Sequence, residues 1–146
     1  MRIAVVIAVL LAAAPALAQD TKTIPADANL VVYRDYAEPT AWAPTLKIDD
    51  KKVAALGQNE FTAVHLAPGS HSISLAWPIF SGQSGKTGTI TIEDGKTIYL
   101  ELTGQSRYAG GGYGTMQFLM GSGLEPRNGM AFGPNSKCCK FKPPKE

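Results

Sequence analysis

The sequence has few of the residues from which catalytic and metal sites are usually built. It contains two cysteines and two histidines in 146 residues. None of its serines lies in the Gly-x-Ser-x-Gly context of a hydrolase nucleophile. No set of acidic and basic side chains has a spacing that indicates general acid–base catalysis. We therefore predict a protein that is not an enzyme and binds no cofactor or metal ion. The alternative is an enzyme whose site joins residues distant in sequence, because function resides in sites and not in folds.

A large excess of one charge is also missing. The formal net charge is +2, and this includes Arg2 near the N-terminus. Nucleic-acid binding normally requires a basic face, so we expect no nucleic-acid partner. Beyond the N-terminus the chain has no apolar run long enough to span a bilayer.

The first 18 residues have the three parts of a secretory signal peptide. Arg2 supplies the positive charge, residues 3–11 form the apolar core, and Ala16-Leu17-Ala18 is a small-x-small cleavage site. Gln19 follows, where exported lipoproteins carry a lipid-bearing cysteine. The pattern predicts cleavage after residue 18, an N-terminal extension over residues 19–28, and a protein that is periplasmic or secreted without a lipid anchor.

Helical periodicity is scarce as well, and alternation of apolar and polar residues takes its place. Short alternating runs between residues 29 and 120 are bounded by Gly, Pro, Asn and Asp, which is typical of strands joined by tight turns. We predict an all-β domain over this range, a single antiparallel β-sandwich of roughly seven or eight short strands, with Trp77 in its core. Residues 121–146 are rich in Gly, Pro, Asn and Lys, and we expect a loosely ordered tail.

Both histidines lie in one predicted hairpin, whose turn is Pro68-Gly69. His71 begins the apolar side of the second strand, and His65 lies on the other arm. We expect a half-buried His71 whose nitrogens bond backbone near the turn, because two histidines with no nearby acidic or cysteine ligand make a poor metal site. Asp94-Gly95 is the strongest hairpin signal in the chain.

Four segments in this order resemble a known family. They are Tyr33-Arg34, residues 48–56 (IDDKKVAAL), residues 64–73 (VHLAPGSHSI) and residues 94–100 (DGKTIYL). The order resembles a bacterial family of small exported proteins and lipoproteins of unknown function, and more distantly the PEGA-type β-domains with their Pro-Gly-x-His turn. The resemblance covers Leu30 to Thr103. It implies an immunoglobulin-like or transthyretin-like sandwich in the cell envelope, with no catalytic residues. Asp50 stands where the pattern often has glycine, so the type of that turn stays open.

Two glycine-containing segments superficially suggest nucleotide binding. Residues 82–87 end in Gly-Lys-Thr, but the first glycine of a phosphate-binding loop is replaced by Phe80. Residues 110–114 are rich in glycine, but the third glycine of a dinucleotide fingerprint falls at Thr115, and no strand–helix–strand unit surrounds it. We interpret both segments as connections between strands.

Aromatic residues in the predicted loops are candidates for binding. Trp42, Tyr36 and Phe80 can form an exposed platform for a glycan or a peptide. The interpretation that we favour is a small apolar cluster that covers one end of the fold. Tyr108 and Tyr113, from the glycine-rich connection, are further contact candidates.

The adjacent cysteines Cys138 and Cys139 have three possible fates in an oxidising compartment: a vicinal disulfide, a bond to another chain, or free thiols. Neighbouring residues offer poor geometry for a disulfide, so we favour an intermolecular or mixed disulfide, and with it an oligomer. Four nearby lysines give the tail a positive charge that anionic envelope material would attract.

The sequence thus predicts a structural or protein-interaction module of the bacterial envelope. Its expected partner is another envelope protein, bound through an edge strand or a loop. The alternative partner is a cell-wall or other glycan polymer, or a small ligand, bound through the loop aromatics.

Overall fold

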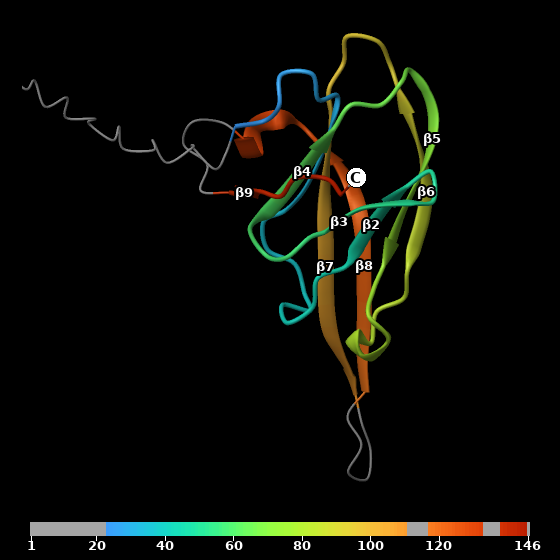
Figure 1. Cartoon of the computed structure of the whole chain (residues 1–146). Helices are drawn as coiled ribbons and strands as arrows, with labels where there is room; N and C mark the ends of the chain where they lie inside the picture. Colours follow the sequence, from blue (N-terminus) through green and yellow to red (C-terminus); the bar gives the residue numbers. More distant parts are fainter. Residues whose placement is uncertain (1–22, 111–116, 133–137, 146) are drawn as a thin grey trace, which may run out of the picture.

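The computed structural model of the protein describes residues 23–110, 117–132 and 138–145 (Figure 1). These residues form nine strands and two short 3-10 helices and contain no α-helix, which confirms the expected all-β class. Within them, no helix has the length and apolarity that crossing a membrane requires. The elements are β1 (Leu30–Arg34), β2 (Thr45–Ile48), β3 (Lys51–Ala55), β4 (Glu60–Val64), β5 (Gly69–Ala76), η1 (Ile79–Ser81), β6 (Lys86–Ile92), β7 (Ile98–Gly110), β8 (Gln117–Arg127), η2 (Gly129–Phe132) and β9 (Lys140–Phe141).

The strands form two sheets. One has five strands in the order β8-β7-β1-β4-β9, and the other has four in the order β3-β2-β5-β6. The four-stranded sheet is antiparallel throughout, whereas the five-stranded sheet is mixed, since β1 pairs with β7, and β4 with β9, in parallel. The purely antiparallel prediction is therefore wrong for the larger sheet. Its parallel neighbours are far apart in the chain, so no hairpin turn sets their direction.

The main core lies between the two sheets and is made by the side chains that face inward from both. The five-stranded sheet contributes Leu30, Val32, Leu100 and Leu102, and the four-stranded sheet contributes Leu46, Ile48, Ile73, Leu75 and Ile92. In β5 the predicted alternation is confirmed, and Trp77, directly after that strand, packs against the same core.

A second apolar cluster lies on the outer face of β1 and β4. All five residues of β1 are buried, because Val31 and Tyr33 are covered on this side just as Leu30 and Val32 are covered on the other. The cover comes from the C-terminal segment, where the Phe141 ring lies 5.1 Å from the ring of Phe61. A strand buried on both faces reads as a continuous apolar run.

The expectation of a loose tail over residues 121–146 is wrong for most of its described residues. Strand β8 continues to Arg127, η2 follows, and β9 lies beside β4. Backbone N–H groups of Lys140 and Lys142 donate to the carbonyls of Asn59 and Phe61, each at 2.7 Å, and Lys145 donates to Val53 at 2.8 Å. The segment is ordered because it covers apolar side chains that would otherwise face water.

The hairpins predicted at Pro68-Gly69 and at Asp94-Gly95 are wrong, because β4 and β5, and likewise β6 and β7, belong to different sheets. Turn residues let the chain change direction, but they do not decide which sheet the next strand joins. The turn residues themselves adopt conformations that explain them. Asp49 and Asp50, between β2 and β3, have φ values of 47° and 64°. Two successive positive φ angles define a type I′ hairpin turn, which settles the turn type that the replacement of glycine left open. Gly69 and Gly95 have φ values of 136° and 70°, a range that favours glycine.

Gly104 of β7 allows the loop that follows β1 to lie directly against the larger sheet. The backbone N–H of Glu38 donates to the Gly104 carbonyl at 3.2 Å. A Cβ atom at position 104 would overlap the carbonyl oxygen of Glu38. Backbone meets backbone at this point, so no side-chain movement can relieve the overlap.

We therefore expect Gly104→Ala to lower the free energy of unfolding by about 1–3 kcal/mol, the usual cost of overpacking. Chemical denaturation measures this change. The matched control is Gly121→Ala in β8, where a Cβ atom would meet nothing within 4 Å. Equal stabilities for the two variants would contradict the close approach at Gly104.

Candidate interaction surface

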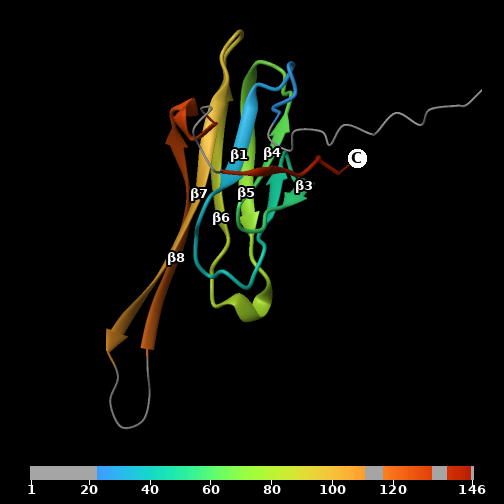
Figure 2. The ribbon, with the colours of Figure 1, turned by 90° about the vertical axis from the view of Figure 1, so that its left-hand side faces the viewer.

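Two loops lie at the same end of the molecule and expose large apolar side chains. They are residues 35–44, between β1 and β2, and residues 77–85, between β5 and β6 (Figures 1 and 2). The exposed fractions are 69% for Tyr36, 38% for Trp42, 92% for Ile79 and 87% for Phe80. We call these four residues the loop-end surface. The packed cluster that we favoured for Tyr36, Trp42 and Phe80 is therefore wrong for Tyr36 and Phe80, whose side chains face outward, while Trp42 is partly covered.

A buried arginine positions the first of these loops. Arg34 ends β1 on the side that Leu30 and Val32 direct into the core, and its exposed fraction is 0%. Sequence reasoning missed this role. The signal was its place, two residues beyond Val32, in a strand whose alternate residues face the core.

The Arg34 guanidinium donates to four backbone carbonyls. Nη1 bonds the oxygens of Trp42 at 2.6 Å and Leu56 at 3.0 Å, and Nη2 bonds those of Ala37 at 2.7 Å and Pro39 at 2.8 Å. Three of these acceptors belong to the loop of residues 35–44. The planar fork of an arginine can hold several acceptors in fixed directions, so one side chain determines the path of the loop.

The charge of Arg34 is stabilised by neutral dipoles from these carbonyls. Burial lowers the pKa of the guanidinium, and the carboxylate of Glu60 opposes this effect. That carboxylate itself accepts hydrogen bonds from the backbone N–H of Gly57 at 2.6 Å and from Lys142 Nζ at 2.9 Å. Losing any of the buried carbonyl partners would leave polar groups unsatisfied, which is costly in an apolar interior.

Trp77 connects the second loop to the same arginine. The Arg34 guanidinium lies 5.4 Å from the centre of the Trp77 ring, within the range of a cation–π contact. The indole Nε1–H donates to Ser122 Oγ of β8 at 3.0 Å. Pro78, Ile79 and Phe80 follow directly, so the two halves of the loop-end surface are positioned by adjoining side chains, Arg34 and Trp77.

A long hairpin extends from the same end of the molecule. Strand β7 pairs with β1 only from Ile98 to Glu101, whereas its pairing with β8 continues to Gly110. The distal part of β7 and β8 projects beyond the two loops as a two-stranded arm (Figure 2). Of the two tyrosine candidates, Tyr108 lies in this arm, in register with Phe118, and Tyr113 lies outside the described residues.

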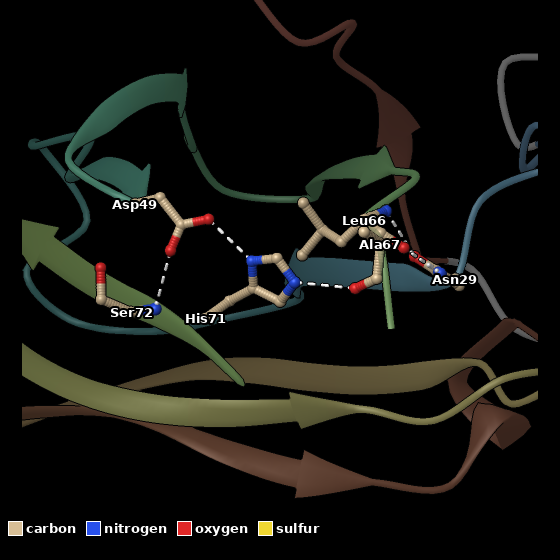
Figure 3. A network of polar contacts seen from close by, with 6 residues as sticks. All are labelled: Asn29, Asp49, Leu66, Ala67, His71 and Ser72. Atoms are coloured by element: carbon tan, nitrogen blue, oxygen red, sulfur yellow. Dashed lines mark hydrogen bonds and ion pairs between the residues drawn. The ribbon is translucent and has the colours of Figure 1, made fainter. Parts of the chain in front are cut away.

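His71 takes part in a polar network near the start of β5, at the end of the strand away from the loop-end surface (Figure 3). Its Nε2 lies 2.8 Å from the Ala67 carbonyl, which is the backbone contact near the turn that we predicted. Its Nδ1 lies 2.7 Å from Asp49 Oδ2, and this partner from another hairpin was not foreseen. The other carboxylate oxygen of Asp49 accepts the backbone N–H of Ser72 at 3.0 Å. His65 contacts the Asp27 carbonyl at 2.8 Å.

The network links the turn between β2 and β3 to the segment before β5. It also occupies both ring nitrogens of His71, so neither is free to transfer a proton. Both ring nitrogens face acceptors, so the doubly protonated ring satisfies both contacts. The hydrogen bond to Asp49 raises the pKa of His71, and the same bond lowers the pKa of Asp49. A general base needs a free nitrogen within reach of its substrate. Asn29 holds the neighbouring segment by exchanging two side-chain hydrogen bonds with the backbone of Leu66, at 2.7 and 2.8 Å.

Cys138 and Cys139 form a vicinal disulfide and are both buried. This is one of the three fates that the sequence allowed, and it corrects the intermolecular bond that we favoured. The sulfur atoms lie within the second apolar cluster, out of reach of another chain. Asp35 places a carboxylate oxygen within 4.8 Å of both sulfur atoms. Metal ions bind thiolates, so the three residues offer a ligand set only when the disulfide is reduced.

The segment ending in Gly-Lys-Thr is a connection, as predicted. Residues 82–85 link η1 to β6, which begins at Lys86. No helix follows, so the N–H groups of a phosphate site are not provided at this place. Of the glycine-rich stretch over residues 110–114, only Gly110 lies within the described residues.

Comparison of the chain with models of protein families, with curated proteins and with solved structures finds no match.

The position of Arg34 predicts a large effect from a small chemical change. We expect Arg34→Lys to lower the free energy of unfolding by about 2–4 kcal/mol, because an ammonium group cannot reach four carbonyls and leaves buried acceptors unpaired. Denaturant titration measures the change. The control is Arg127→Lys, whose ion pairs with Glu101 and Glu125 are partly exposed and should contribute no more than about 1 kcal/mol. A smaller loss for Arg34→Lys than for the control would refute the role of Arg34.

The His71–Asp49 pair predicts a pH-dependent contribution to stability. The raised pKa of His71 means that its stabilising effect is complete below about pH 6.5 and is lost as the pH rises through the raised value. The lowered pKa of Asp49 means that its contribution is present above about pH 3.8 and is lost at more acidic pH. His71→Gln should therefore destabilise the protein more at about pH 5.5 than at about pH 8.5.

Unfolding of wild type, His71→Gln, Asp49→Asn and the double variant at both pH values tests this pair. The double variant should lose no more pH dependence than either single variant. A His71→Gln effect that is the same at both pH values would show that the ion pair adds nothing.

Proposed function

We propose that the protein is a non-catalytic β-sandwich module, exported to the cell envelope, whose loop-end surface binds another envelope protein. The four exposed residues Tyr36, Trp42, Ile79 and Phe80 are the observation that carries this proposal. The loops that carry these side chains lie at one end of the molecule, and exposed apolar surface often marks an interaction site. Export and cleavage after residue 18 are inferred from the N-terminal sequence.

The way in which the surface is supported favours binding. Arg34 fixes the loop backbone through four carbonyls, and Trp77 is held by Arg34 and Ser122. Side chains presented on a fixed backbone lose less conformational entropy when they bind. The sandwich of immunoglobulin-like, transthyretin-like or PEGA-like kind is the architecture that we infer for this support, because the two sheets share one core.

A glycan polymer is the second candidate partner. Trp42 and Tyr36 belong to the same loop and expose 38% and 69% of their surface, as residues that stack on sugar rings must. Ile79 and Phe80 offer no hydrogen-bonding groups in their side chains, and this favours an apolar protein surface over a sugar as the ligand.

Replacing the exposed tip of the second loop tests the proposal. We expect Ile79→Ser combined with Phe80→Ser to weaken capture of the envelope partner tenfold or more, because truncating an interface anchor typically costs about 2 kcal/mol. The immobilised protein is incubated with envelope extracts, and retained proteins are quantified by mass spectrometry. A parallel experiment measures co-sedimentation with purified cell-wall polymer.

The matched control is Met130→Ser, which removes a side chain that is 76% exposed on η2. Both variants should keep the wild-type melting temperature, since none of these side chains is packed in the core. An identical set of captured proteins for wild type and the double variant would overturn the proposal. Retention by cell-wall polymer that Trp42→Ala abolishes would establish the glycan alternative in its place.

A further inference from the structure

We propose that the protein forms a symmetric dimer in which β6 pairs with β6 of a second copy, antiparallel and centred on Thr89. This inference uses a surface separate from the loop-end surface and does not depend on the proposed function. It would join the four-stranded sheets of two molecules into one continuous sheet.

Strand β6 has fewer protections against edge pairing than β3, β9 and the C-terminal end of β8. On the described part of the chain, β3 is short, begins with Lys51 and Lys52, and accepts a hydrogen bond from Lys145. β9 has two residues. β8 carries Pro126 and the ion-paired Glu125 and Arg127. Such short lengths, prolines and charges are devices that prevent edge pairing.

In contrast, β6 has seven residues, KTGTITI, and pairs with β5 in a regular register without a bulge. Its single charge is Lys86, at the first position, and it contains no proline. A long, regular and nearly neutral edge is a template for another strand.

The direction of the backbone groups identifies which residues of β6 are available. The Ser72 carbonyl of β5 accepts the N–H of Asp49, on the β2 side of β5. Because the backbone groups of successive residues point to opposite sides of a strand, His71 and Ile73 direct theirs toward β6, where their partners are Ile90 and Gly88. Thr87, Thr89 and Thr91 therefore direct their N–H and C=O groups to the free edge.

In a two-fold symmetric pairing centred on Thr89, the free N–H and C=O groups of one β6 lie opposite the same groups of the second copy. Thr89 then lies opposite Thr89 of the second copy, and Thr87 lies opposite the second copy's Thr91. All three outward-facing threonines fall at positions where antiparallel neighbours exchange both hydrogen bonds. Their exposed side chains would form cross-strand threonine pairs, which stabilise sheets.

The same register fills an open groove beside β6. This groove, of about 370 Å³, lies between β6 and the strands β7 and β8 and is lined by apolar side chains that include Ile90, Leu100 and Leu124. At Gly88 a Cβ atom would meet nothing within 4 Å. Centring on Thr89 places Ile90 of the second copy opposite Gly88, on the core-facing side. The Ile90 side chain of the second copy would thus occupy the open space beside Gly88.

Charge selects the antiparallel direction and a second copy as the occupant. The strand begins with Lys86 and is followed by the exposed Glu93 and Asp94, of which Glu93 is ion-paired with Lys96 and Asp94 supplies the negative charge. Antiparallel self-pairing brings the positive start of one β6 next to the negative end of the other at both ends of the interface. Parallel pairing would place like charges together.

A charge-exchange experiment tests the dimer and its centre. Molar mass is measured by analytical ultracentrifugation across a wide range of concentration. We expect wild type to approach the mass of two chains, whereas Thr89→Lys and Thr89→Glu should each remain at the mass of one chain, because like charges would face each other across the two-fold axis. An equimolar mixture of the two variants should dimerise again, which also shows that both are folded.

Thr97→Lys is the matched control, since Thr97 is exposed but lies outside β6, and it should dimerise like wild type. Wild type that stays at the mass of one chain overturns the proposal. So does a Thr89→Lys variant that still dimerises, or a mixture that does not. The Ile79→Ser, Phe80→Ser variant should dimerise normally; if it does not, the loop-end surface forms the dimer, and this inference fails without deciding the fate of the proposed function.

Discussion

The arrangement of the exposed loops depends on one buried cation. Arg34 ends a strand whose other residues are apolar, and its guanidinium replaces water for four backbone carbonyls. A loop that lies over a core must satisfy its polar backbone groups, and usually it does so by facing solvent. Here the Arg34 side chain donates hydrogen bonds to these carbonyls from the core side of the loop. The loop can therefore direct Tyr36 and Trp42 outward while its backbone stays packed against Gly104.

A second constraint acts on the other face of the same strand. Because Val31 and Tyr33 point away from the main core, β1 needs a cover on its outer side, and the C-terminal segment supplies it with Cys138, Cys139 and Phe141. Strand β1 thus lies at the centre of both apolar clusters. The two observations explain why the run Leu30 to Tyr33 is apolar at every position rather than at alternate ones.

Much of the local structure was predictable, and most of the long-range structure was not. Alternation and turn residues indicated the strands from Leu46 to Leu102. Asp94-Gly95 marked a true turn, but it connects the two sheets and does not join a hairpin. The residues of β7 and β9 do not indicate that these strands pair in parallel with β1 and β4. Pairing between segments that are distant in the sequence depends on which apolar faces must be buried. The unbroken apolar run of β1 was the available signal for that cover. The outward direction of Phe80 had no signal in its sequence, since an aromatic residue in a loop suits a packed or an exposed position equally well.

The parallel pairing of β9 with β4 has a consequence for the order of folding. Glu60 and Phe61 find their neighbours Lys140 and Phe141 near the end of the chain. Contacts between such distant segments form slowly because a large loop must close first. During synthesis from the N-terminus, the outer face of β1 would remain exposed to solvent until residues 138–141 are available to cover it. During that interval the incompletely folded chain would expose the apolar outer face of β1, which is prone to aggregate and which a chaperone could bind.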